Sequence, residues 1–278
     1  MNNRVELVID EGVASVRLAR PEKLNALDPP MFEALAEVGA RLGAHRGLRA
    51  VVISGEGRGF CAGVDLERIS SVANGQSLLP FADLTERTHG PANFVQHVVW
   101  QWRELAVPVV AAVHGIAFGA GFQLALGADL RYVAPGTQFS ILETKWGLVP
   151  DMAGIHLMRH LAKEDIVREL TYTARIFTAE EALRYGFVSH LVEDPLSAAM
   201  ETARQIASRS PDAIRAAKRL LNLATARDAE TILSEETAAQ TRLLASTNQI
   251  EAVKSNLEGR SARFVDPDPV VPARPSAA

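Results

Sequence analysis

The sequence predicts an α/β fold, with a layered core followed by a helical subdomain. Over residues 1–194, short apolar runs typical of buried strands alternate with amphipathic helical segments, which is the pattern of a sheet layered with helices. From residue 195 to residue 265 the pattern is helical with few strand signals, which indicates a separate subdomain suited to oligomerisation. Residues 266–278 contain four prolines, so we expect a loose tail.

The N-terminal region predicts a hairpin and then a helix. Val5–Ile9 and Val13–Leu18 have strand character and are joined by a short acidic turn that ends in glycine. Asp28 is a suitable cap for a helix that begins at Pro29 and runs to about Leu42, because proline is well tolerated in the first helical turn.

The middle of the chain alternates buried strands with helices. Ala50–Ser54 is a continuous apolar run, as expected of a strand covered on both faces. Ser70–Pro91 has no consistent period and is expected to be a loop or lid. The apolar spacing of Phe94–Leu105 predicts an amphipathic helix, and Val109–Val113 and Leu130–Ala134 are the next predicted strands.

The C-terminal region lacks strand signals and reads as a series of helices. The helical segments are predicted at Ser197–Ser208, Pro211–Leu223 and Asp228–Leu257.

Composition and charge exclude several classes of protein. The 278 residues carry 29 basic and 33 acidic side chains, a formal net charge of −4, and no basic run that would bind nucleic acid. No apolar run reaches the length of a membrane span, and the N-terminus has no apolar signal segment, so we expect a cytoplasmic protein. The single cysteine, Cys61, permits no internal disulfide, and we expect no metal site.

Two segments share one design, a buried strand followed by a glycine-bearing turn that enters a helix. These segments are Val51–Leu66 and Val109–Gly121. Glycines allow close approach of the backbone, and a helix start offers unpaired N–H groups. Two such turns can converge on one oxyanion. Ordinary strand-to-helix turns and a dinucleotide site are the alternatives, but Gly119-Ala120-Gly121 lacks the glycine at the sixth position of the dinucleotide motif.

Five segments, in this order, carry a family resemblance. They are RPEKLNAL (Arg20–Leu27), FCAGVDL (Phe60–Leu66), HGIAFGAGFQLALGADLRY (His114–Tyr132), FSILETKWGLVPDMAG (Phe139–Gly154) and TAEEALRYGFVSHLV (Thr178–Val192). Over roughly residues 5–264 the chain therefore resembles the crotonase, or enoyl-CoA hydratase/isomerase, family.

The resemblance implies a crotonase-like spiral of ββα units, a homotrimer or dimer of trimers, and an acyl-CoA thioester substrate with no additional cofactor. It implies that the N–H groups of Ala62 and Ala120 form the oxyanion hole, with alanine at Ala120 where glycine is commoner in the family. The implied coenzyme A contacts are Lys23, Ala26, Ala62, Gly63, Val64, Asp65 and Leu66. Lys23 can equally be an exposed turn residue.

Three side chains are the candidates for proton chemistry. Hydratases of the family use two glutamates, and the first of these positions is Gln123 here, which cannot accept a proton near neutral pH. The second is Glu143, and Asp151 stands where hydratases tend to have glycine. A Glu and an Asp on one acyl chain can move a proton between carbons. The alternatives are a surface carboxylate for Glu143, a helix cap for Asp151, and a buried backbone partner for Gln123.

Other residues near these segments are expected to be structural. His97 and His114 are interpreted in this way, and Cys61 is interpreted as small packing because no base accompanies it. Phe122 and Trp146 belong either to the acyl pocket or to the core.

The sequence favours an isomerase that moves a double bond through an enolate stabilised by the oxyanion hole. One alternative is a hydratase that uses Glu143, and another is an acyl-CoA hydrolase or dehalogenase that uses Asp151 or Glu143. A non-catalytic member that binds acyl-CoA is the remaining alternative.

Overall fold

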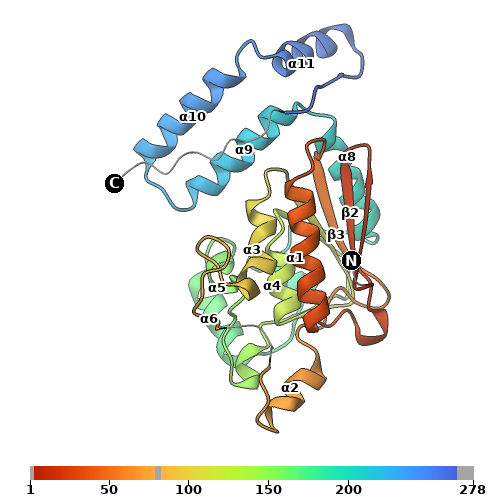
Figure 1. Cartoon of the computed structure of the whole chain (residues 1–278), viewed down its shortest axis with the longest axis vertical. Coiled ribbons are helices and arrows are strands. Elements are labelled where there is room, and N and C mark those ends of the chain that lie inside the picture. The colour runs from red at the N-terminus through yellow and green to blue at the C-terminus, as the bar shows by residue number, and fades with distance from the viewer. Residues whose placement is uncertain (1–2, 79–82, 268–278) are drawn as a thin grey trace.

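The computed structural model describes residues 3–78 and 83–267 (Figure 1). Two sheets organise the fold. The main sheet has the order β1-β2-β3-β4-β6-β9, in which β1 and β2 are antiparallel and the other neighbours are parallel. The second sheet has the order β5-β7-β8. The strands are β1 (Val5–Asp10), β2 (Val13–Leu18), β3 (Ala50–Gly55), β4 (Val109–Val113), β5 (Ile116–Phe118), β6 (Leu130–Val133), β7 (Gln138–Ser140), β8 (Phe177–Thr178) and β9 (His190–Leu191).

Helices follow the strands and then continue alone to the C-terminus. They are α1 (Pro29–Gly43), α2 (Leu66–Val72), α3 (Phe94–Glu104), α4 (Ala120–Leu126), α5 (Gly154–Met158), α6 (Glu164–Thr173), α7 (Ala179–Tyr185), α8 (Pro195–Ala207), α9 (Pro211–Ala224), α10 (Ala229–Leu243) and α11 (Thr247–Glu258), with the short 3₁₀ helices η1 (Pro21–Lys23) and η2 (Glu143–Trp146). None of the helices in the described ranges is both long enough and apolar enough to cross a membrane.

The spiral arises because the chain alternates between the two sheets. Strand β4 lies in the main sheet, β5 in the second, and α4 follows; then β6 returns to the main sheet and β7 to the second. Each strand–strand–helix unit therefore adds one strand to each sheet. The α/β fold class and the ββα spiral are confirmed, although the short strands β5, β7, β8 and β9 were not predicted from the sequence.

Helices cover both faces of the main sheet. Phe32 and Leu35 of α1 and Trp102 of α3 are fully buried in the principal core. On the opposite face Ala199 and Ala203 of α8 pack against the apolar residues of the central strands. Helix α8 therefore belongs to the layered core, although it was predicted as part of the helical subdomain.

The helices α9, α10 and α11 form an arm that projects from the core (Figure 1). The arm is anchored by Lys218, whose Nζ donates to the carbonyl oxygens of Trp102 (3.0 Å) and Val107 (2.8 Å) and to Oδ2 of Asp129 (2.8 Å). The prediction of one helix over Asp228–Leu257 was wrong, because the chain leaves the helical conformation at Leu244, the C-cap of α10, and Ala245 then takes a positive φ of 59°.

Two sequence predictions fall partly outside the described residues. In the predicted loop Ser70–Pro91, α2 ends at Val72 and residues 79–82 are not described. In the predicted tail 266–278, residues 268–278 are not described.

Candidate active site

The two glycine-bearing turns lie directly against each other. Cys61 and Ala117 form a parallel bridge, and the Phe118 N–H donates to the Cys61 carbonyl oxygen at 3.1 Å. At Gly121 a side chain would overlap the Cys61 carbonyl, so glycine is required for this approach. The predicted pairing of the two turns is therefore confirmed.

One predicted donor, the Ala120 N–H, stands at the start of α4. Ala120 is the first residue of this helix, and the Gly119 carbonyl accepts from the Gln123 N–H at 3.0 Å. The first N–H groups of a helix have no partner within the helix. Ala120 also lines a cavity that adjoins this turn, so its N–H is suited to bind an oxygen there.

The other predicted donor, the Ala62 N–H, is already engaged. It donates to the Leu24 carbonyl oxygen at 2.9 Å, so the choice of Ala62 as a donor has to be corrected. Two residues later, the Gly63 carbonyl accepts from the Leu27 N–H at 2.7 Å. Because a trans peptide directs its N–H opposite to its C=O, the Val64 N–H points away from Leu27. Val64 lines the cavity and replaces Ala62 as the candidate donor.

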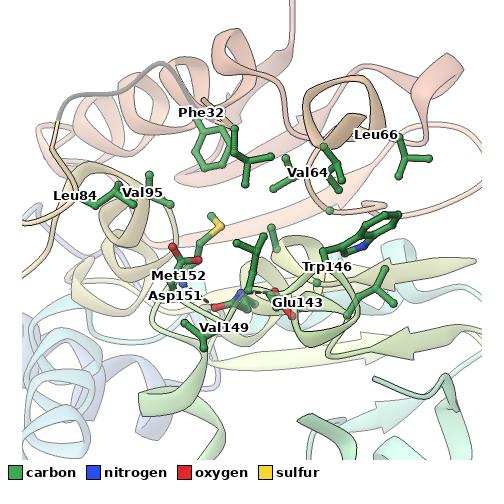
Figure 2. Close-up of a pocket in the computed structure, with 18 of the residues that line it drawn as sticks. Phe32, Val64, Leu66, Leu84, Val95, Glu143, Trp146, Val149, Asp151 and Met152 are labelled. Atoms are coloured by element: carbon green, nitrogen blue, oxygen red, sulfur yellow. Dashed lines mark hydrogen bonds between the residues drawn. The ribbon is translucent and has the colours of Figure 1, made fainter. Parts of the chain in front are cut away.

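A cavity of about 450 Å³ adjoins both turns. Its size is within the range of small-molecule sites. In Figure 2, Phe32, Val64 and Leu66 lie on one side, and Glu143, Asp151 and Met152 on the other. Most of the lining is apolar: Phe32, Val64, Leu66, Ile69, Leu78, Leu84, Val95, Leu142, Trp146, Leu148, Val149 and Met152. A predominantly apolar cavity with few carboxylates suits an acyl chain.

Glu143, in η2, is one of the cavity's carboxylates and is only 8% exposed. It is therefore not a surface carboxylate. Its Oε1 accepts a hydrogen bond of 2.6 Å from Gln123, while Oε2 is buried with no partner among the described residues. Burial raises the pKa of the Glu143 carboxyl, and the charge of Asp151 acts in the same direction, whereas hydrogen bonds from the backbone and Gln123 oppose the rise.

Asp151 lies on the same cavity wall, with its side chain open to the cavity. Surrounding protein atoms raise the pKa of its carboxyl by desolvation. The alternative role as a helix cap is wrong, because α5 begins at Gly154 with Ala153 as its N-cap and without a capping side chain. Asp151 is therefore available to a bound molecule.

Gln123 is buried and hydrogen-bonded at both ends of its amide. Its Oε1 accepts from the N–H groups of Met152 (2.8 Å) and Gly154 (3.0 Å), and its Nε2 donates to Glu143. The predicted backbone contact is present, but it occurs together with the contact to Glu143. Gln123 thus links α4, η2 and the loop that carries Asp151.

The residues implied for coenzyme A binding divide into two groups. Gly63, Val64 and Leu66 line the cavity together with Ala62. The residues Lys23, Ala26 and Asp65 do not lie among the described residues that line it. Each of these three makes other contacts.

Polar contacts behind the first turn hold the implied coenzyme A segment in place. Asp65 accepts from the buried Arg20 at 2.5 Å and caps α2 through the Glu67 N–H. Arg20 also donates to the Ala26 carbonyl at 3.1 Å, and Lys23 pairs with Glu67 at 2.6 Å on the surface. Arg20 was not predicted as part of the site, because no local pattern points to its partner, which lies 45 residues away.

The structure shows which of the two aromatic residues, Phe122 and Trp146, lies in the core and which lines the cavity. Phe122 packs with Phe139, Phe177 and Phe187 at centroid distances of 5.3–5.7 Å and belongs to the core. Trp146 is 41% exposed and lines the cavity.

The remaining candidates have structural contacts. His97 stacks on His89 with ring centroids 3.8 Å apart, and His114 lies 2.8 Å from the Gly57 carbonyl oxygen. Complete burial raises the pKa of the Cys61 thiol to about 12, so this cysteine is not a nucleophile near neutral pH.

The spiral fold and its carboxylate-bearing apolar cavity define an enzyme of the acyl-CoA class. The chain belongs to the enoyl-CoA hydratase/isomerase family, whose model matches residues 8–267.

Relatives and solved structures agree with this assignment. The chain is 30% identical to the 1,2-epoxyphenylacetyl-CoA isomerase of Escherichia coli, over 92% of this chain and 96% of the relative. It is 36% identical to the carnitinyl-CoA dehydratase of Salmonella arizonae, over 79% of this chain and 80% of the relative.

Two crystal structures of enoyl-CoA hydratases superpose over most of the chain. The one from Polaromonas has a TM-score of 0.83 at 27% identity and covers 94% of this chain and 99% of that one. The one from Bacillus anthracis has a TM-score of 0.82 at 26% identity and covers 94% of this chain and 98% of that one.

Proposed function

We propose that this enzyme isomerises an unsaturated acyl-CoA by moving a double bond within the acyl chain. The observation that carries the proposal is the pair of carboxylates, Glu143 and Asp151, on one wall of an apolar cavity. Gln123 stands at the position of a hydratase glutamate and is occupied by three hydrogen bonds. The proton chemistry is therefore assigned to Glu143 and Asp151.

The thioester oxygen would bind between the N–H groups of Val64 and Ala120. Removal of a proton from the acyl chain places negative charge on that oxygen, and preorganised donors stabilise it. Loss of one such donor typically costs about 3 kcal/mol of transition-state stabilisation. Coenzyme A enters as part of the substrate, so the reaction needs no further cofactor.

The two carboxylates would divide the proton transfer. One begins ionised and takes a proton from carbon; the electron pair of that C–H bond moves toward the thioester, and the double bond shifts. The other begins protonated and delivers its proton to the carbon at the far end of the shifted system. Support comes from the raised pKa of each carboxyl, because a carboxyl must hold a proton near neutral pH to act as the acid.

Hydration or dehydration is the second candidate function. It is favoured by the similarity to a carnitinyl-CoA dehydratase and by the buried Oε2 of Glu143, which can bind a water molecule. Hydrolysis of the thioester, dehalogenation and non-catalytic binding are the other outcomes that an assay must separate.

The test is product analysis by mass after incubation with 2-enoyl-, 3-enoyl- and dienoyl-CoA in heavy water. We expect an isomerised product that carries deuterium but has gained no water. A product that has gained a whole water would show that the enzyme is a hydratase and not an isomerase. Release of free coenzyme A would indicate a hydrolase, and release of halide would indicate a dehalogenase. Glu143→Gln should lower kcat about 10²- to 10⁴-fold. Full activity of this variant would exclude Glu143 from the chemistry.

The arm of α9–α11 is proposed to bind further copies of the chain, in a homotrimer or a dimer of trimers. Leu221 is 69% exposed, Leu233 is 61% exposed and Leu257 is 84% exposed, which favours burial against another subunit. Light scattering of the purified protein tests this. A monomer at assay concentrations would contradict it.

A further inference from the structure

We infer that Gln123 is a positioning residue that assigns proton transfer to one atom, Oε2 of Glu143. This inference deepens the proposed function and rests on it in so far as Glu143 acts as an acid or base.

The orientation of the Gln123 amide follows from its partners. Backbone N–H groups can only donate, so the amide atom facing those of Met152 and Gly154 must be the oxygen. The NH₂ group is then directed at Glu143 Oε1, at 2.6 Å. The amide cannot flip without leaving two buried donors unpaired, which is costly.

A donor at this place dictates which carboxylate oxygen carries a proton. The hydrogen bond from the amide lowers the basicity of Oε1 of Glu143, and an amide NH₂ offers no lone pair to a proton on that oxygen. A proton taken up by Glu143 therefore goes to Oε2. This atom is buried, has no hydrogen-bond partner among the described residues, and belongs to a side chain that lines the cavity.

The backbone is shaped around this contact. A Cβ at Gly154 would lie 2.5 Å from Oε1 of Gln123, and one at Gly119 would lie 3.3 Å from Oε1 of Glu143. Glycine at both positions gives the amide and the carboxylate the room they occupy. Because Gln123 also binds Met152 and Gly154, it fixes Glu143 relative to the loop that carries Asp151.

A titration that needs no substrate tests the inference. Carbon NMR of protein labelled at the glutamate carboxyls, with Glu143→Gln to assign the signal, follows the midpoint of Glu143. In Gln123→Met the donor is lost, so we expect a higher midpoint. Gln123→Glu keeps an acceptor for Met152 and Gly154 and should also raise the midpoint, by repulsion between carboxylates. Ile69→Ala, elsewhere in the cavity wall, is the control and should leave the midpoint unchanged.

Catalysis supplies the second readout. In Gln123→Met we expect kcat to fall about 10- to 100-fold with KM within about threefold, because the carboxylate is displaced rather than the substrate. The limb of the pH–rate profile that reports Glu143, the acid limb if Glu143 begins as the base and the basic limb if it begins as the acid, should move to higher pH. An unchanged Glu143 midpoint in both Gln123 variants would overturn the inference, as would an unchanged kcat. A wild-type enzyme that moves no double bond would overturn the proposed function, while the titration would still decide the role of Gln123.

Discussion

Gly121 of α4 packs against the carbonyl group of Cys61, and this contact brings the two turns of the cavity together. A methyl group at Gly121 has no room, since both the carbonyl oxygen and the Cβ of Cys61 lie in its way. Val64 lies three residues after Cys61, and Ala120 lies directly before Gly121. Their separation is therefore sensitive to it.

Gly121→Ala should separate the turns and lower both stability and activity. We expect a loss of about 1–3 kcal/mol in the free energy of unfolding, which is typical of overpacking, together with a lower kcat. Gly43→Ala is the matched control, because its added methyl group would lie 3.9 Å from Leu105. Thermal unfolding and the isomerase assay check both variants. If Gly121→Ala were as stable and as active as Gly43→Ala, the contact would not position the site.

Glu143→Gln should stabilise the protein near neutral pH while it removes activity. The pKa of Glu143 is raised in the folded state by burial, so the ionised carboxylate costs stability above the folded-state pKa. As the pH falls through that pKa, the folded protein takes up the proton and the cost is relieved. The gain from the variant should therefore vanish near pH 4, about the pKa of an unfolded glutamate, and grow as the pH is raised from there toward 8.

Denaturant unfolding of wild type and Glu143→Gln across this pH range makes the comparison. Glu67→Gln, at an exposed side chain of α2, serves as the control for loss of one carboxylate. A stability difference that stayed constant with pH would show that the Glu143 carboxyl is not perturbed by folding.

The sequence was sufficient for elements whose pattern is local. Asp28 accepts a hydrogen bond from the Met31 N–H at 3.0 Å and so caps α1, which begins at the next residue, Pro29. The sequence predicted this cap from the position of Asp28 before Pro29. The hairpin register, with Val5 opposite Leu18, follows from the short turn. Ala245 lacked such a signal, because alanine favours helices, and the acceptor of its N–H, Oε1 of Gln249 at 3.2 Å, lies in the next helix.

In the first turn, the candidate donor, Val64, lies two residues after the predicted one, Ala62. The motif FCAGVDL located the turn. Which of its N–H groups faces the cavity depends on the hydrogen bonds between this turn and residues 24–27. The motif alone does not indicate these hydrogen bonds. Leu24 engages Ala62 and Leu27 engages Gly63, which leaves Val64 directed away from them. The partners of Gln123 were equally invisible, since they lie 20–31 residues away in sequence.

Lys218→Met should loosen the arm from the core. The Lys218 side chain is 5% exposed and pairs with Asp129 at 2.8 Å, besides its two carbonyl contacts. Removal of one partner from a buried ion pair typically costs about 3–5 kcal/mol. Lys254→Met, on the exposed face of α11, should change stability by less than about 0.5 kcal/mol. Thermal unfolding and limited proteolysis of the arm measure the effect. Equal stability of the two variants would show that Lys218 does not anchor the arm.

Asp151→Asn separates the two halves of the proposed proton transfer. An asparagine keeps the size and polarity of the side chain but neither accepts nor releases a proton near neutral pH. If Glu143 and Asp151 act at different carbons, deuterium exchange from heavy water should survive at one carbon, while double-bond migration falls about 10²- to 10⁴-fold. In Glu143→Gln, any deuterium exchange that remains should be at the other carbon. The double variant should show no exchange. NMR of the recovered acyl chain locates the deuterium. Migration at the wild-type rate in Asp151→Asn would mean that Glu143 alone carries the proton between the two carbons.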